Sequence, residues 1–235
     1  AEVFMSAEDA IGDDHGHNRP GEDGLYYLYP TNSVFKDGVF DIERADFLID
    51  GRHLLLRVYL GNVLSNAEVG WGALNPGSSC GNPNKAQLNL QKIDLYIDSD
   101  EEAGSQIGYP ERYVDIAPWD AWDYGAVADG WWVSLNRSNN SDNIGDWTKM
   151  TGPNKVHICN DYVENFVEIY MSLEALELLE AEEELDAAKL DAIRTELKTW
   201  DYIIAVSGHD GDSNADNLGG TRAVNPGTAE WQFGG

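Results

Sequence analysis

The stretch ADFLIDGRHLLLRVYLG (residues 45–61) decides the fold class. Two apolar runs, ADFLI and HLLLRVYLG, flank the dipeptide Asp50-Gly51. An Asp-Gly dipeptide between such runs is a strong signal for a β-hairpin, because Asp and Gly tolerate the positive φ angles that tight hairpin turns require. We therefore predict two antiparallel strands joined at this dipeptide.

Similar strand-like runs occur over most of the chain. VFKDGVFDI (residues 34–42) contains a second hairpin signal at Asp37-Gly38, and KIDLYID (92–98) alternates apolar and polar residues like a half-buried strand. The further runs are WWVSL (131–135), KVHICN (155–160), YVENFVEIYMS (162–172), DYIIAVSGHD (201–210) and EWQFGG (230–235). Many short strands separated by Gly, Asn and Asp turns predict an all-β antiparallel β-sandwich, which we expect to form one domain over residues 1–235.

Residues 173–199 depart from this pattern, because they are rich in the strong helix formers Leu, Ala, Glu and Lys. Ser172 is a suitable N-cap, and Leu190, Ile193, Leu197 and Trp200 fall on one helical face. Three successive glutamates at residues 182–184 interrupt the apolar stripe, so we predict two helices with a bend near Asp186. We interpret this segment as a helical insertion that covers one end of the sandwich; the alternative is a helix that binds a partner.

The chain is strongly acidic, with 42 acidic and 15 basic side chains and a formal net charge of -27. Such a surface repels phosphate backbones and anionic lipids, which argues against nucleic acid and membrane surfaces as partners. No apolar stretch approaches the ~20 residues that a membrane-spanning helix needs. Two explanations of the acidity stay open, namely carboxylates neutralised by Ca²⁺ and an adaptation to high salt.

The two cysteines, Cys80 and Cys159, either form one disulfide that closes a long loop or remain as two buried thiols. A disulfide would fit an oxidising, extracellular compartment. The opening AEVFMSAEDA has no basic or long apolar segment and resembles the start of a mature chain after removal of a signal peptide. We therefore expect a secreted protein.

Three groups of oxygen-bearing side chains are candidate Ca²⁺ ligands. Near the C-terminus, side chains with oxygen atoms recur at alternate positions, as in the first half of an EF-hand loop. Ala215 and Thr221 stand where that loop has Gly and Glu, so this is not an EF-hand. We expect either a looser calcium loop or a solvated acidic turn. The second group follows the N-terminal strand-like residues, and the third, weaker group follows KIDLYID. The three sets are Asp210, Asp212, Asn214 and Asp216; Asp9, Asp13 and Asp14; and Asp98 and Asp100.

Aromatic side chains concentrate in one region of a chain that has 8 Trp and 11 Tyr. A flat indole or phenol ring can stack on the apolar C–H face of a sugar, or it can fill the core of a sandwich. We expect one or two of these rings to face a ligand and the others to be buried. The candidates are Trp119, Trp122, Tyr124, Trp131 and Trp132.

Several motifs, in order along nearly the whole chain, resemble the C-terminal module family of glucodextranase. They are GDDHG (12–16), YLYPTN (27–32), FKDGVFDI (35–42), QKIDLYIDSDEEAG (91–104), WDAWDYGAVADGWW (119–132), SGHDG (207–211) and EWQFGG (230–235). The resemblance implies a DOMON-like sandwich, similar to family 9 carbohydrate-binding modules and appended to secreted α-glucan hydrolases such as glucodextranase and amylopullulanase. It also implies structural Ca²⁺, with Asp9, Asp13 and Asp14 as ligands and Asp210 completing that site.

The sequence departs from the family pattern at HNRPGEDG (17–24), at DGDSNADN (210–217) and in the acidic helical segment. These departures leave the ligand open. No HExxH, CxxC or P-loop motif occurs, and nothing in the pattern favours catalysis.

We therefore predict a non-catalytic, calcium-dependent carbohydrate-binding module, secreted or at the cell surface, for an α-glucan or a cell-surface glycan. A glycoside hydrolase domain or a cell-surface layer is the expected protein partner. Two alternatives remain. One is a haem-binding electron carrier with axial ligands from Met5, Met150, Met171 or a histidine. The other is a structural protein of a surface layer or filament, to which the N-terminal segment contributes a strand.

Overall fold

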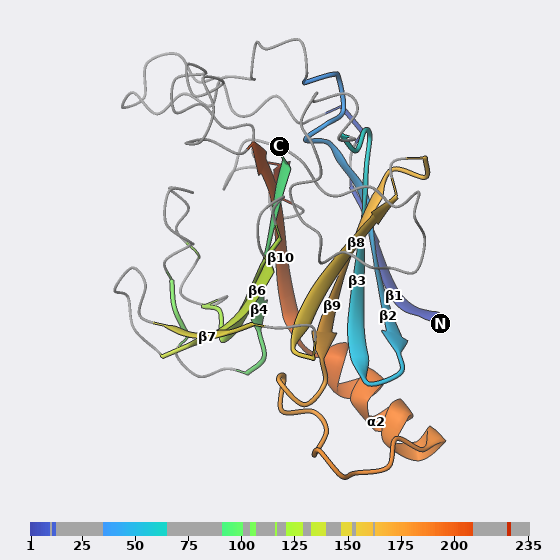
Figure 1. Cartoon of the computed structure of the whole chain (residues 1–235), viewed down its shortest axis with the longest axis vertical. Coiled ribbons are helices and arrows are strands. Elements are labelled where there is room, and N and C mark those ends of the chain that lie inside the picture. Colours follow the sequence, from blue (N-terminus) through green and yellow to red (C-terminus); the bar gives the residue numbers. More distant parts are fainter. Residues whose placement is uncertain are drawn as a thin grey trace.

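The computed structural model describes residues 1–9, 11–12, 35–64, 91–100, 104–106, 116, 121–128, 133–139, 147–151, 154–161, 163–208 and 225–226. Within these ranges the chain forms two antiparallel sheets packed face to face, with one helix at the end of the sandwich (Figure 1). The predicted β-sandwich is confirmed. The elements are β1 (Val3–Glu8), β2 (Ile42–Asp50), β3 (His53–Leu60), β4 (Gln91–Asp98), β5 (Tyr124–Ala128), β6 (Val133–Ser138), β7 (Trp147–Met150), β8 (Val156–Asp161), β9 (Phe166–Ser172), α2 (Ala187–Leu197), β10 (Asp201–Gly208) and β11 (Asn225–Pro226).

One sheet has the order β1-β2-β3-β9-β8 and the other the order β11-β10-β4-β5-β6-β7. The hairpin predicted from residues 45–61 joins β2 to β3, with Asp50 paired to His53 and Gly51 at a φ of 57°. The second Asp-Gly signal gives a different structure. Val39 donates to the carbonyl of Lys36 in a turn, but residues 35–41 contain no strand, so Asp37-Gly38 is not a hairpin loop. Gly38 instead packs against the backbone of Gly61, which allows the chain to fold closely at the end of β3.

The core lies between the two sheets. Alternate residues of β3, Leu54, Leu56, Val58 and Leu60, point into it and are almost completely buried. Ile93, Leu95 and Ile97 of β4 belong to the same core. β4 is not half-buried as its alternation predicted, because its other face is covered as well, and Asp94 and Lys92 are buried there.

The helical segment is only partly as predicted. α2 begins after Asp186, whose carboxylate accepts from the backbone N–H of Lys189 at 2.8 Å, so the predicted bend is an N-cap. Ile193 and Leu197 are buried in the core, which confirms that the helix covers one end of the sandwich (Figure 1). Residues 173–185 form turns, so the prediction of a first helix is wrong. Ser172 still accepts from Ala175, but it caps only a single turn.

None of the described residues forms a helix long and apolar enough to cross a lipid bilayer. The described strands and α2 share a common core, and the extension of a single domain over all of residues 1–235 stays a prediction.

Removing side-chain volume from this core should destabilise the fold. Leu56 is fully buried at the centre of β3, and we expect Leu56→Ala to lower the free energy of unfolding by about 2–5 kcal/mol, because it leaves a cavity between the sheets. Urea denaturation measures the difference. Val163→Ala is the matched control, since Val163 is 72% exposed and its truncation should change stability by less than about 0.5 kcal/mol. Equal effects of the two substitutions would contradict the sheet packing described here.

Candidate functional site

Three carboxylates meet at one end of the six-stranded sheet. Asp98 ends β4, Asp100 follows two residues later, and Asp123 immediately precedes β5. Because β4 and β5 are antiparallel, with Ile97 paired to Tyr124, the last residues of β4 and the first residues of β5 lie side by side at the same end of the sheet. Each carboxylate has an oxygen within 4.8 Å of the other two, and no other group of three such metal-ligating side chains is found in the described part of the chain.

Backbone and hydroxyl groups hold this cluster in place. The N–H of Asp123 donates to the carbonyl of Ile97 at 2.8 Å. The Ser99 N–H and hydroxyl both donate to Oδ2 of Asp123, at 2.9 and 2.8 Å. The N–H of Asp100 donates to Oδ1 of Asp98 at 3.3 Å. The three side chains are therefore fixed by the turn after β4 as well as by the strand pairing.

A glycine after the cluster packs against the segment that immediately precedes β5. A Cβ atom at Gly104 would lie 2.2 Å from the carbonyl oxygen of Ala121, so only glycine fits there. This close approach allows Ser105 and Trp122 to form an isolated antiparallel bridge, with N–H···O distances of 2.9 and 3.0 Å. The bridge sets the position of Asp123, the next residue.

Electrostatic repulsion among the three carboxylates would be reduced by a bound cation. Burial raises the pKa of Asp98 to about 6, and the negative charges of Asp123, Asp201 and Asp100 add to the shift, while the hydrogen bond from the Asp100 backbone opposes it. A divalent cation relieves this repulsion. Oxygen ligands with partial solvent access suit Ca²⁺, which takes six to eight oxygens including water. Asp98, Asp100 and Asp123 would hold the ion, and the residues present fit it.

A cleft of about 620 Å³ adjoins the cluster. Asp100 and Asp123 form part of its wall, and Arg137 of β6, Tyr124 of β5 and Trp200, which follows α2, form much of the rest. The rings of Tyr124 and Trp200 are stacked at a centroid distance of 6.2 Å and an interplanar angle of 13°. The cleft thus combines charged groups with an aromatic pair, which is the composition of many small-molecule sites.

Glu177 projects into this cleft from a backbone conformation that is rare for its residue type. Its φ is 60°, a strained conformation for a residue other than glycine. The Glu177 carboxylate forms an ion pair with Arg137 and accepts a hydrogen bond from the hydroxyl of Tyr124. Burial raises the pKa of Tyr124 to about 12, and the charge of Glu177 contributes, so the phenol stays protonated and donates. Strain of this kind is often concentrated at functional sites.

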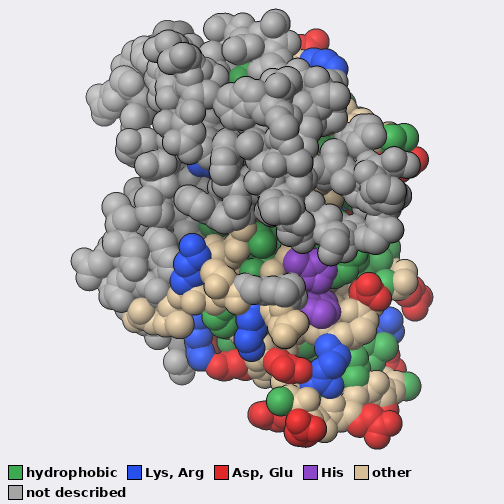
Figure 2. Space-filling model, viewed as in Figure 1, with side chains coloured by type: hydrophobic (Ala, Val, Ile, Leu, Met, Phe, Trp, Pro, Cys, Tyr) green, Lys and Arg blue, Asp and Glu red, His purple; other side chains and the backbone are tan. Residues whose placement is uncertain are grey.

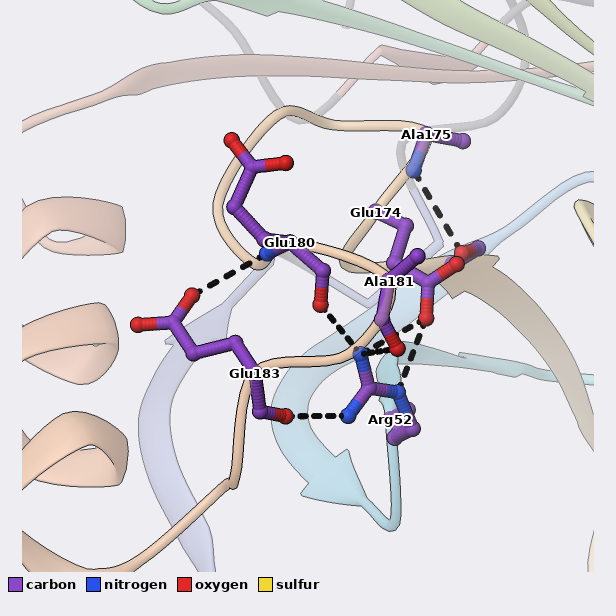
Figure 3. A network of polar contacts seen from close by, with 7 residues as sticks. Arg52, Glu174, Ala175, Glu180, Ala181 and Glu183 are labelled. Atoms are coloured by element: carbon purple, nitrogen blue, oxygen red, sulfur yellow. Dashed lines mark hydrogen bonds and ion pairs between the residues drawn. The ribbon is translucent and has the colours of Figure 1, made fainter.

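Arg52 fixes the loop that carries Glu177 (Figure 3). Its Nε donates to Oε1 of Glu174 at 2.8 Å, and its Nη atoms donate to the carbonyls of Glu180, Ala181 and Glu183 at 2.6–3.2 Å. A helix over residues 173–185 would use the carbonyls of Glu180 and Ala181 as acceptors for its own N–H groups. The bonds from Arg52 therefore stabilise the observed turns in place of a helix over this segment. Acidic side chains gather on this end of the molecule (Figure 2).

The structure separates the predicted site residues. Asp98 and Asp100 lie in the carboxylate cluster, together with Asp123, which sequence reasoning did not single out. Asp9 follows β1, at the end of the β1–β2 ladder away from the hairpin, and its N–H donates to the carbonyl of Glu43 at 3.0 Å. The other predicted calcium ligands lie outside the described residues; they are Asp13, Asp14, Asp210, Asp212, Asn214 and Asp216.

Of the five candidate aromatic rings, two are described. Trp122 is completely buried beside Tyr96, Ile116 and Ile203, so it is a core ring and cannot stack on a ligand. Tyr124 is largely buried but lines the cleft. Trp119, Trp131 and Trp132 lie outside the described residues. Trp200, which we assigned to the helical face, is the tryptophan that lines the cleft, and its buried indole N–H has no acceptor within the described part of the chain.

Cys159 is buried on β8 and is disulfide-bonded. The only other cysteine of the chain, Cys80, lies outside the described residues.

The family described as the C-terminal binding-module, SLH-like, of glucodextranase matches residues 4–235. The chain belongs to this family. The predicted resemblance is therefore confirmed over almost the entire length, and the family description is that of a binding module. No curated protein matches the chain in sequence. The cleft and the carboxylate cluster thus lie in a member of a family of binding modules.

The raised pKa of Asp98 predicts an unusual pH dependence in buffer free of divalent cations. The folded state binds the Asp98 proton more tightly than the unfolded state, in which the pKa is near 3.8. The contribution of Asp98 to the free energy of unfolding should therefore decrease as the pH rises from about 4 to about 6. Urea denaturation across this window measures the slope for the wild type and for Asp98→Asn, which imitates the protonated form. The difference between the two slopes isolates Asp98, and identical slopes would contradict the assignment.

Proposed function

We propose that this chain is a non-catalytic carbohydrate-binding module that takes part of a glycan into the cleft beside the carboxylate cluster. The family match over residues 4–235 carries the proposal, because the family is that of the binding module of glucodextranase. Glucodextranase gives the substrate class: an α-glucan, or a cell-surface glycan of related chemistry. The sequence contains no HExxH, CxxC or P-loop motif.

The chemistry of the cleft supports this ligand class. Sugar hydroxyls act as both donors and acceptors, and the cleft offers a guanidinium at Arg137, carboxylates at Asp100 and Glu177, and an amide at Asn139. The stacked rings of Tyr124 and Trp200, both largely buried, form an apolar part of the cleft wall. The net negative charge of the wall disfavours acidic polysaccharides.

We further propose that Ca²⁺ binds at Asp98, Asp100 and Asp123 and holds this wall of the cleft together. The cation would neutralise carboxylates that otherwise repel one another, and it lies at the edge from which Asp100 and Asp123 face the ligand. The disulfide-bonded Cys159 supports a secreted or cell-surface location, because disulfides persist in oxidising compartments. A glycoside hydrolase domain is the proposed protein partner.

Glycan binding should depend on Arg137 and Glu177, the charged pair that lines the cleft. Arg137→Ala and Glu177→Gln each remove a group that is about half exposed, so the fold should survive while affinity falls by about tenfold or more, as expected for the loss of a hydrogen bond to a charged group. Isothermal titration with malto-oligosaccharides and dextran fragments in calcium buffer measures this. Lys36→Ala, which removes a charge from an exposed turn outside the cleft, should bind as the wild type does. Absence of binding to every glycan tested would refute the carbohydrate proposal.

Calcium should stabilise the protein through the carboxylate cluster. We expect Ca²⁺ to raise the unfolding temperature of the wild type, by an amount equivalent to about 2.7 kcal/mol at a concentration one hundred times the Kd. Asp123→Asn should lose most of this effect, whereas Asp191→Asn on the exposed surface of α2 should retain it. Thermal unfolding with Ca²⁺ and with a chelator gives the comparison. If Asp123→Asn keeps the full shift, the ion binds elsewhere, and the proposal for this cluster fails.

A further inference from the structure

Two histidines meet on the outer face of the five-stranded sheet. His53 begins β3 and His157 lies on β8, and these strands flank β9. Their sequence neighbours Leu54, Val156 and Ile158 point into the core, so the histidines point to the opposite face. Both are half-buried, and the histidine side chains coloured in Figure 2 form a single patch on the surface. This patch is on the other sheet from the carboxylate cluster.

The spacing of the two rings suits one shared metal ion. Their centroids are 5.5 Å apart and their planes are inclined at 78°. Two imidazoles that bind one ion at a metal–nitrogen distance of about 2.0–2.1 Å and a tetrahedral angle have ring centroids about 5.2 Å apart. The inclination keeps the rings from stacking on each other. The observed centroid separation therefore matches that of two imidazoles that share one ion.

Neighbouring side chains restrain the pair. The ring of Tyr170 stacks on His157 at a centroid distance of 4.3 Å and an angle of 11°, and its centroid is 6.4 Å from that of His53. The hydroxyl of Tyr170 donates to Oε2 of Glu168 at 3.0 Å. Since Tyr170 is held at both its ring and its hydroxyl, it limits the orientations of the His157 imidazole, which is the role that outer contacts play around metal ligands.

Charged groups of both signs lie near the pair. Glu168 is buried and paired with Arg57 at 2.7 Å, so these two charges largely compensate each other. Asp50 is exposed and lies opposite His53 on the β2–β3 hairpin, where its charge also acts on Tyr170. Arg52, the nearby basic residue of the hairpin, is directed into the acidic loop (Figure 3). Asp50 therefore supplies a negative charge close to the pair, and Lys155, two residues before His157, supplies a positive one.

We propose that His53 and His157 together bind a divalent transition-metal ion such as Zn²⁺, Ni²⁺ or Cu²⁺. Imidazole nitrogen selects these ions over Ca²⁺, which prefers oxygen ligands, so this site is chemically distinct from the carboxylate cluster. Two protein ligands leave at least two positions of a tetrahedral ion open to water or to a donor from a second molecule. The proposal is independent of the glycan-binding function.

Zinc titration of a variant with only these two histidines tests the proposal. The other histidines, His15, His17 and His209, are first replaced by Asn, which removes competing nitrogen ligands. In saturating Ca²⁺, isothermal titration of this parent protein should show one Zn²⁺ per chain. Adding His53→Asn or His157→Asn should weaken binding by about tenfold or more, because one of two protein ligands is lost. Adding Asp191→Asn, on the exposed surface of α2 and away from the pair, is the control and should leave the affinity near that of the parent.

A second readout does not depend on removing a ligand. In the parent protein, the ring C–H resonances of His53 and His157 should shift together at the same ratio of Zn²⁺ to protein in an NMR titration. Failure of the parent to bind Zn²⁺, unchanged affinity after either His→Asn substitution, or a shift of only one ring would overturn the shared site.

Discussion

The guanidinium of Arg52 is the constraint on which the architecture of the candidate site depends. It lies in the two-residue loop between β2 and β3, in one sheet, and it binds three backbone carbonyls and one carboxylate of residues 174–183. The turns of residues 173–185 supply Glu177 to a cleft at the end of the other sheet. A charged group bound to several acceptors at once gives a geometrically stricter restraint than an isolated surface ion pair. The hairpin of one sheet thus helps to shape the binding wall of the other.

Local patterns predicted most of the strands, because a strand with one buried face leaves its period in the sequence. The hairpin at Asp50-Gly51 was predicted because the dipeptide separates two apolar runs, and the structure confirms it. The failures occurred where distant residues decided the outcome. β4 is buried on both faces because residues distant in sequence cover the face that carries its polar side chains. Residues 173–185 have good helix propensity, but Arg52, a residue distant in sequence, binds three carbonyls of this segment and stabilises its turns.

The candidate site was only partly predictable for the same reason. Asp98 and Asp100 are neighbours in sequence, whereas Asp123 and Arg137 join them only through the pairing of β4, β5 and β6. Trp122 and Tyr124 are equivalent in an aromatic-rich motif, yet one ring enters a small core cluster and the other lines the cleft. The acidic composition predicted cation ligands, and the many Trp and Tyr residues predicted an aromatic binding surface. Only the strand register determines which of these side chains lie together. His53 and His157, on non-adjacent strands, carry no local signal at all.

The strand order has a consequence for how the chain acquires its structure. β3 pairs with β9 and β4 pairs with β10, so each sheet contains an interior pairing of segments that are far apart in sequence. Such a topology has a high contact order, and closing the large intervening loops slows folding. During synthesis the five-stranded sheet is incomplete until β9 has left the ribosome, and the six-stranded sheet until β10 and β11 have. Until then β2, β3 and β4 expose apolar faces, and the dense negative charge of the chain keeps such unfinished molecules apart and limits their aggregation.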